Sequence, residues 1–97
     1  MPVMSEERAV LVRITGRVQG VWYRGWTVRE CQSRGLSGWV RNRSDGTVEA
    51  LISGPREAVA AMLDVLWEGP SSAFVTGVDF ETAKAPEFKG FRQIRGE

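Results

Sequence analysis

Apolar and polar residues alternate along residues 8–15 of the chain. Val10, Val12 and Ile14 fall on one face of this stretch, while Ala9 and Leu11 fall on the other. A period of two is that of a β-strand, and apolar residues on both faces are typical of a strand in the middle of a sheet. The pattern therefore predicts a central strand over residues 8–15.

Two later stretches have the period of a helix. Over residues 22–34, an inward stripe is formed by Tyr23, Thr27 and Cys31 with Trp26 beside it, and Gly35 follows as a C-terminal cap. The second helix is predicted to open at Gly54-Pro55, since proline suits the first helical position, and to stop at Gly69-Pro70. Its inward residues are Val59, Met62, Leu63, Leu66 and Trp67.

Alternation returns at residues 36–42 and 47–52, on either side of Arg43-Ser44-Asp45-Gly46. An Asp-Gly step between two alternating stretches predicts a β-hairpin. Further strands are expected at residues 74–81, with a bulge or bend at Gly77, and at residues 91–95 after a polar loop. The residues expected to supply the buried faces of the hairpin are Trp39, Val48 and Ala50 or Ile52. In the strand at residues 74–81, Val78 and Phe80 are expected on one face.

The predicted order is strand, helix, strand, strand, helix, strand and a short terminal strand. With right-handed crossovers this order gives an α+β, ferredoxin-like split βαβ sandwich, in which an antiparallel sheet carries two helices on one face. At 97 residues the chain is long enough for one domain. We predict a flexible N-terminal tail at residues 1–7 and a single domain at residues 8–97.

Composition narrows the possible functions. The net charge of +1 gives no reason to expect a nucleic acid or a membrane surface as partner. Cys31 is the single cysteine, so no internal disulfide exists, and we expect no signal peptide or membrane span. The chain has no histidine, which excludes an imidazole base and the common nucleophile systems. Metal-binding spacings are absent from the sequence as well.

The candidate chemistry lies in the stretch GRVQGVWYR, residues 16–24. It reads as a loop between a strand and the start of a helix, where unpaired backbone N–H groups favour an anion. Arg24 falls in or near the first helical turn, where the macrodipole disfavours a cation, and no acid lies between Gly16 and Arg29. Arg24 is therefore a candidate ligand for a phosphate group, although alone it is equally consistent with a surface arginine.

This stretch and a second one, GWVRNRSDGTVE at residues 38–49, resemble the two signature motifs of the acylphosphatase family. The resemblance covers nearly the whole chain from Ala9 onward. It implies metal-independent hydrolysis of acyl phosphates to a carboxylate and inorganic phosphate, with no cofactor. It further implies that Arg24 binds the phosphoryl group and that Asn42 orients the attacking water. The main-chain N–H groups that it assigns to phosphate binding are those of Gln19, Gly20, Val21, Trp22, Tyr23 and Arg24.

Two residues depart from the family pattern: Trp22 stands at a position often filled by a smaller residue, and Tyr23 replaces the commoner phenylalanine. Trp22 would narrow the mouth of the site. The alternative is a phosphate- or RNA-binding module on the same fold without catalysis. We expect a cytoplasmic monomer that acts on a small acyl phosphate, without nucleic acid or membrane partners.

Several residues have a simpler structural interpretation. Asn42 alone is more typical of an Asx turn leading into the hairpin, and Gln19 of a loop residue whose backbone matters more than its side chain. Asp45 is explained by the turn and Glu49 by a solvated strand face. Arg41 and Arg43 are expected to be solvated, where either could steer an anionic substrate. Residues expected in the core are Trp26, Trp39, Trp67 and Cys31.

Overall fold

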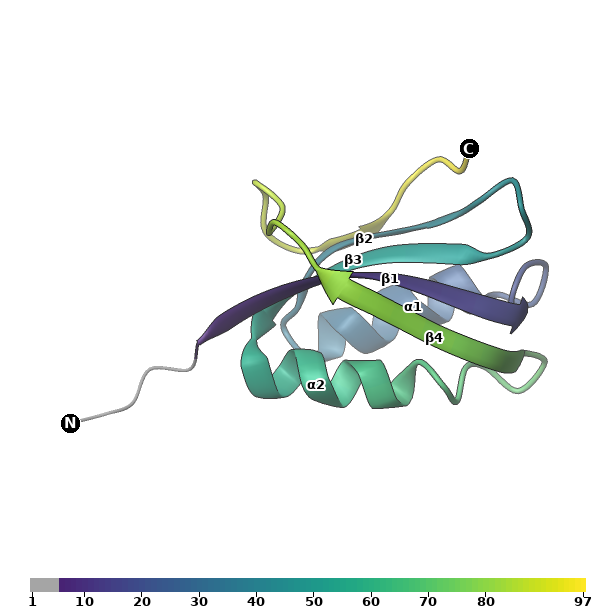
Figure 1. Ribbon diagram of the computed structural model, residues 1–97, viewed down its shortest axis with the longest axis horizontal. Coiled ribbons are helices and arrows are strands. Elements are labelled where there is room, and N and C mark those ends of the chain that lie inside the picture. The colour runs from purple at the N-terminus through teal and green to yellow at the C-terminus, as the bar shows by residue number, and fades with distance from the viewer. Residues whose placement is uncertain (1–5) are drawn as a thin grey trace.

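The computed structural model describes residues 6–97, which form five strands and two helices (Figure 1). Their bounds are β1 Glu7–Arg17, α1 Tyr23–Ser33, β2 Ser37–Asn42, β3 Val48–Pro55, α2 Arg56–Val65, β4 Phe74–Thr82 and β5 Phe91–Gln93. Of the predicted tail, residues 1–5 lie outside the described residues. Glu7 already belongs to β1, and the carbonyl of Glu6 accepts a hydrogen bond of 2.8 Å from the N–H of Arg56.

The strands form one sheet in the order β4-β1-β3-β2-β5. β1 pairs antiparallel with both β3 and β4, and β3 pairs antiparallel with β2, as predicted for a ferredoxin-like α+β fold. The prediction of a wholly antiparallel sheet is wrong at one edge, because β5 runs parallel to β2. After β4 the chain crosses over the sheet, so that β5 enters beside β2 in the same direction (Figure 1).

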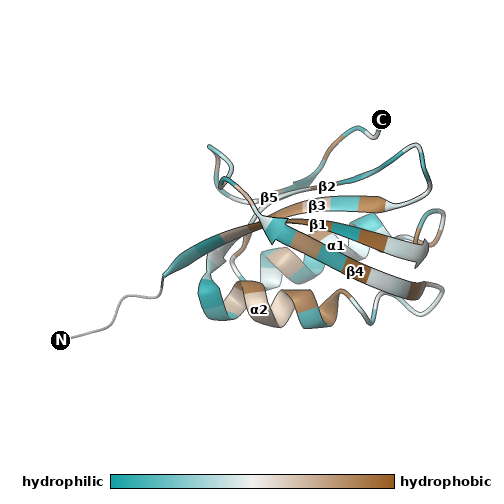
Figure 2. Cartoon of the chain, viewed as in Figure 1, coloured by the Kyte–Doolittle hydropathy of each residue, from teal (hydrophilic) through white to brown (hydrophobic). Residues whose placement is uncertain are grey.

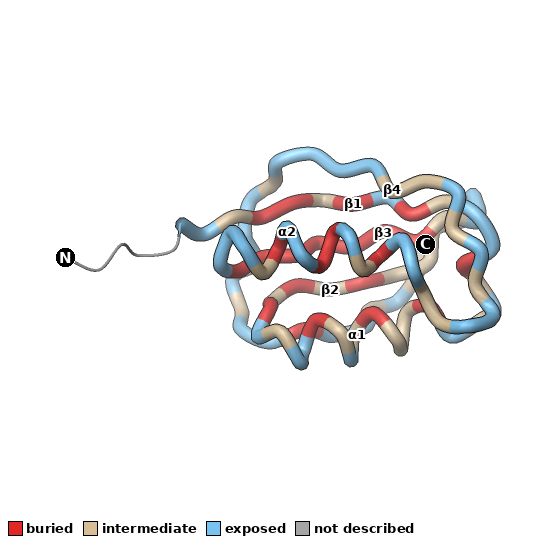
Figure 3. Tube along the Cα trace, turned by 90° about the horizontal axis from the view of Figure 1, so that it is seen from below, coloured by how far each residue is buried: buried red, intermediate tan, exposed pale blue. Residues whose placement is uncertain are grey.

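Both helices lie side by side across one face of the sheet, and the core fills the space between them and the strands (Figure 3). β1, β3 and α2 each contribute three buried apolar residues to this core, and Figure 2 shows the apolar side of α2 in brown. α1 is more polar, yet it buries Tyr23, Thr27 and Cys31, the stripe that its spacing predicts. The fully buried aliphatic residues include Val10, Val12, Ile14, Val40, Ile52, Met62 and Leu66.

Two of the tryptophans expected in the core are not there. Trp39 pairs with Leu51 on the open face of the sheet, where the guanidinium carbon of Arg41 lies 5.3 Å from the centre of its ring. Trp67 is 50% exposed, since it follows the end of α2 and its N–H bonds back to Asp64 in a tighter turn that rotates it off the apolar stripe. Trp26 is partly buried and packs against the core as expected.

In strand β4, Val78 and Phe80 share one face, as predicted, since they pair with the buried Ile14 and Val12 of β1. Val78 packs against the core, whereas Phe80 is half exposed because β4 is an edge strand. The predicted bulge near Gly77 is present: Thr15 pairs with Gly77 and Gly16 with Val75, so that Thr76 is the extra residue. Within residues 6–97, no helix combines the length and the apolar character needed to cross a membrane.

Candidate active site

The loop at residues 18–22 leaves the end of β1 and leads directly into α1. Gly20 and Trp22 both have left-handed backbone conformations, with φ of 75° and 67°. Alternation between right- and left-handed residues turns successive N–H groups toward one side of a loop. Within residues 6–97, no N–H group from Gln19 to Gly25 donates to a main-chain carbonyl, and the first helical bond is that from Trp26 to Trp22, at 3.0 Å. The loop therefore presents an unusual concentration of donors, as an anion requires.

Trp22 is the only non-glycine residue between positions 6 and 97 with a positive φ. It was predicted as the first residue of the helix, but it is the N-cap in the left-handed region. That conformation costs on the order of 1–3 kcal/mol and persists only where the surroundings fix it. The indole packs against the backbone of Gly25, and the guanidinium carbon of Arg29 lies 5.6 Å from its ring centre. More than half of the side chain stays exposed beside the loop, as expected for a residue at the mouth of a site.

Arg24 lies in the first turn of α1, which contains no acidic residue. Its side chain is half-buried and makes no hydrogen bond or ion pair with any of residues 6–97. The positive end of the helix dipole and the guanidinium therefore add to the field of the free N–H groups. Both features favour an anion at this end of the helix.

Tyr23, the first residue of α1, fixes the start of this helix. Its hydroxyl donates a 2.6 Å hydrogen bond to the carbonyl of Leu66 at the end of α2, and Thr27 donates to the carbonyl of Tyr23 at 2.9 Å. The ring is 1% exposed, and burial raises the pKa of the Tyr23 hydroxyl. Because Arg24 follows Tyr23 directly, this anchor sets the point from which the guanidinium extends.

Asn42 is the last residue of β2 and pairs with Val48 of β3. Paired residues of neighbouring strands share a face, and Val48 is fully buried in the core. Asn42 therefore lies on the helix-covered face, the face on which α1 carries Arg24. Its Oδ1 atom is buried and has no hydrogen-bond partner within residues 6–97. A buried acceptor without a partner costs free energy, which makes this oxygen a candidate for binding a reactant.

The Asx-turn interpretation of Asn42 is wrong, because Asp45 makes that turn instead. Asp45 Oδ1 accepts hydrogen bonds from the N–H and the hydroxyl of Thr47, at 3.0 and 2.6 Å. These bonds from Thr47 lower the pKa of Asp45. The Asp45 interpretation is thus confirmed, and the side chain of Asn42 remains free of any role in the turn.

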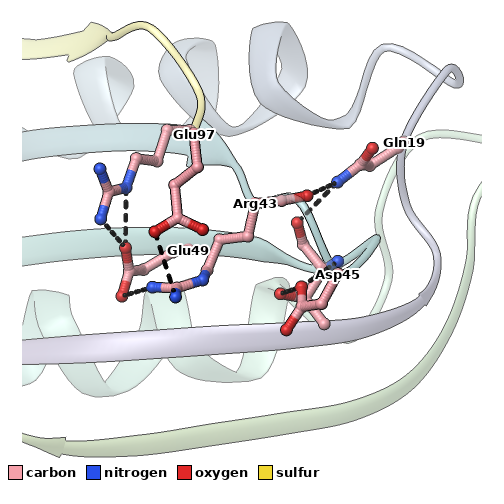
Figure 4. Close-up of polar contacts among 7 residues, drawn as sticks. Gln19, Arg43, Asp45, Glu49 and Glu97 are labelled. Atoms are coloured by element: carbon pink, nitrogen blue, oxygen red, sulfur yellow. Dashed lines mark hydrogen bonds and ion pairs between the residues drawn. The ribbon is translucent and has the colours of Figure 1, made fainter.

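Gln19 joins the loop to the hairpin (Figure 4). Its Nε2 atom donates to the carbonyls of Arg43 and Thr47, at 2.8 Å in both cases. The segments that carry Arg24 and Asn42 meet at this point, although no hydrogen bond connects those two side chains within the described residues. Sequence reasoning assigned only the backbone of Gln19 a role. A loop glutamine whose acceptors are carbonyls 24 and 28 residues away gives no local signal.

Glu49 was expected on a solvated strand face, but it is buried. Its carboxylate lies 2.8 Å from Arg41 and 3.0 Å from Arg43, and Arg43 also pairs with Glu97 at 3.2 Å (Figure 4). The expectation that Arg41 and Arg43 are solvated is therefore wrong as well. Because both charges are already paired, they are poorly placed to steer an anionic substrate.

Two further observations bear on the chemistry of this end of the sheet. Among residues 6–97, no group of three or more His, Cys, Asp or Glu side chains lies close enough together to hold a metal ion. A surface hollow of about 290 Å³ lies on the open face of the sheet between β1, β3 and β4, away from the loop.

Comparison with known proteins agrees with this geometry. The family model described as Acylphosphatase matches residues 10–93. The chain is 56% identical over 93 residues to an acylphosphatase of Rhizobium meliloti (strain 1021), which covers 95% of this chain and 98% of that protein. It is also 56% identical over 86 residues to an acylphosphatase of Rhodospirillum rubrum, covering 89% and 94%. Among solved structures, an acylphosphatase from Coxiella burnetii superposes with a TM-score of 0.86 at 34% identity, covering 91% and 93% of the two chains.

Proposed function

The chain belongs to the acylphosphatase family, and from this premise we propose how its residues hydrolyse an acyl phosphate to a carboxylate and inorganic phosphate. The observation that carries the proposal is the run of unpaired N–H groups from Gln19 to Gly25 around an arginine in an acid-free helical turn. In this proposal the phosphoryl oxygens accept hydrogen bonds from the N–H groups of Gln19 to Arg24, and the guanidinium of Arg24 adds a paired contact.

Asn42 is proposed to orient the attacking water. Its buried Oδ1 atom, which has no partner within residues 6–97, can accept one hydrogen of the water, while the amide nitrogen offers two further donors. A water held there faces the phosphoryl group from the end of β2, because Asn42 and α1 lie on the same side of the sheet. Positioning of this kind and electrostatic stabilisation supply most of the catalysis in phosphoryl transfer.

The reaction requires no histidine. The oxygen of the water forms a bond to phosphorus as the bond between phosphorus and the acyl oxygen breaks, and the electron pair leaves with the carboxylate. A carboxylate leaves without protonation because its pKa lies near 4. One proton of the water passes to a phosphoryl oxygen and the other stays on the oxygen newly bound to phosphorus, so that the products are a carboxylate and dihydrogen phosphate, which is inorganic phosphate. The negative charge that spreads over the phosphoryl oxygens is stabilised by Arg24 and the loop.

We further propose that residues 8–97 act as one domain, in the cytoplasm, as a monomer and without a nucleic-acid partner. The continuous sheet from β1 to β5 supports the single domain. The balanced charge supports the absence of a nucleic-acid partner, and the single thiol suits a reducing compartment. Among residues 6–97, the large apolar side chains that stay exposed lie on the loop, after the end of α2 and on β4, and this scatter supports a monomer.

The test is the hydrolysis of benzoyl phosphate in the presence of a chelator. Arg24→Ala is expected to abolish turnover and to raise the inhibition constant of phosphate. Asn42→Ala is expected to lower kcat by about 10²–10³-fold while the inhibition constant of phosphate changes little, because its partner is the water. Arg34→Ala is the matched control, since Arg34 follows the far end of the same helix and pairs with Glu30. Wild-type rates in both site variants would contradict the proposed roles.

A further inference from the structure

The side chain of Gln19 lies against the turn end of the β2–β3 hairpin (Figure 4). Its amide nitrogen has two hydrogens, and each one is used: one bond goes to the carbonyl of Arg43 and one to that of Thr47, both at 2.8 Å. Both carbonyls also accept a main-chain hydrogen bond: that of Arg43 from the N–H of Gly46 at 3.1 Å, and that of Thr47 from the N–H of Arg43 at 2.9 Å. The glutamine thus completes the last pair of the hairpin and has no amide hydrogen left for a substrate.

This last pair adjoins Asn42. Arg43 follows Asn42 in the chain, and Thr47 precedes Val48, the residue with which Asn42 pairs. Within the described part of the chain, the two bonds from Gln19 are the only hydrogen bonds between residues 18–24 and residues 42–48. The sheet pairing of Asn42 with Val48, and of Val48 with Ile14, fixes the strands, and the side chain of Gln19 adds the direct link between the loop and the segment next to Asn42.

We propose that Gln19 is a positioning residue whose side chain holds Asn42 at a fixed distance from the phosphate-binding loop. The proposal rests on the roles of Arg24 and Asn42 given above. One residue then serves two segments, because its backbone N–H lies in the loop while its side-chain amide holds the hairpin. Without the amide the loop still binds phosphate, but the water held by Asn42 is no longer aligned with the phosphorus. Misalignment of about 1 Å is enough to slow such a reaction markedly.

A double-mutant cycle tests this dependence. Gln19→Met keeps the length of the side chain and removes both donors, and it is expected to lower kcat about tenfold for benzoyl phosphate, with the inhibition constant of phosphate changed less than about twofold. In an Asn42→Ala background the same change is expected to lower kcat less than about twofold, because the residue through which Gln19 acts is gone. Gln32→Met is the matched control. The side chain of Gln32 also donates to a backbone carbonyl, that of Phe91 at 3.2 Å, but this bond lies at β5 and not at the loop.

A second variant gives a readout that a purely structural role would not change. In Gln19→Glu, a carboxylate faces two carbonyl oxygens and repels them, whereas the protonated acid can again donate one hydrogen bond. The ratio of the variant's kcat to that of the wild type is expected to rise as the pH falls from about 7 to about 5. If urea unfolding shows that Gln19→Met does not fold, the pH profile of Gln19→Glu still tests the positioning role of Gln19.

The outcomes separate the two proposals. An equal loss of kcat from Gln19→Met in both backgrounds, or a flat pH ratio for Gln19→Glu, would overturn the positioning role and leave Arg24 and Asn42 in theirs. Full activity of Asn42→Ala would instead overturn the proposed function, and with it the basis of this inference.

Discussion

Replacing Tyr23 by phenylalanine removes one oxygen atom and leaves the ring in place. The hydroxyl donates to the carbonyl of Leu66 at 2.6 Å, and the two residues are 1% and 0% exposed. This bond joins the start of α1 to the end of α2. Phenylalanine fits the space left by the ring, so the change tests the hydrogen bond without a steric effect.

The expected loss of stability follows from what the variant leaves behind. The carbonyl of Leu66 keeps its burial and loses its donor, and a buried carbonyl without a partner costs about 1–3 kcal/mol. For a domain of this size, 1 kcal/mol corresponds to a fall in Tm of about 4–8 °C. The buried ring is retained and still holds the start of α1, from which Arg24 extends, so kcat for benzoyl phosphate should stay within about twofold of the wild type.

Urea unfolding followed by circular dichroism measures the effect, with Thr27→Val as the control. Thr27 is as buried as Tyr23, but its acceptor, the carbonyl of Tyr23, retains its helical partner when the hydroxyl is removed. The control should therefore lose less stability than Tyr23→Phe. If Tyr23→Phe unfolds within about 0.3 kcal/mol of the wild type, or is no less stable than Thr27→Val, the carbonyl of Leu66 does not depend on this donor.

Three further predictions concern stability. Burial raises the pKa of the Cys31 thiol from 9.0 to about 12, so the folded state favours the neutral thiol. The free energy of unfolding of the wild type should therefore fall as the pH rises above about 9, and it should fall less steeply in Cys31→Ala. Equal slopes for the wild type and the variant would refute this. Glu49→Gln removes the carboxylate of Arg41 and leaves Arg43 with Glu97 alone, and it should cost about 2 kcal/mol in urea unfolding. A loss below about 0.5 kcal/mol would mean that solvent and Glu97 serve the two arginines equally well. In Gly38→Ala the new methyl group would collide with the backbone of Leu51, so the free energy of unfolding should fall by at least about 2 kcal/mol. Gly46→Ala is the control and should lose clearly less, because Gly46 has a positive φ but open space around it. Equal losses in the two variants would contradict the packing argument.

Local patterns in the sequence predict the order of elements well. Alternation marks four of the strands, the spacing of Tyr23, Thr27 and Cys31 marks α1, and the Asp-Gly step marks the hairpin. Each of these patterns involves residues only a few positions apart, and the conformations of turns and caps are set by the residue types within them. The position of the loop between β1 and α1 could be predicted for the same reason.

What the sequence could not predict depends on residues far apart in the chain. Trp39 was assigned to the core because it is large and apolar, yet its smaller neighbours Gly38 and Val40 are the buried residues of β2. Glu49 is buried because two arginines surround it, and the direction of β5 depends on where the chain crosses the sheet. None of these relations has a signal in local spacing.

The same limit applies to the candidate site. Arg24 and the loop could be proposed because a cation in the first turn of a helix is disfavoured by the helix dipole. This conflict involves only neighbouring residues and can therefore be recognised in the sequence. Only the backbone of Gln19 could be proposed in this way, since the acceptors of its side chain lie on the β2–β3 hairpin. The proposed role of that side chain rests on two hydrogen bonds between segments far apart in the chain.

The loop at residues 18–22 has one more consequence, which concerns how this site can change over evolutionary time. Its proposed contacts to phosphate come mainly from peptide groups, which every residue type except proline supplies equally. The side chains at positions 21 and 22 can therefore be substituted, which would change the contacts to the acyl part of the substrate. The proposed backbone contacts to the phosphate would stay the same. What selection must preserve there is a set of dihedral angles, chiefly those of Gly20 and of the residue at position 22.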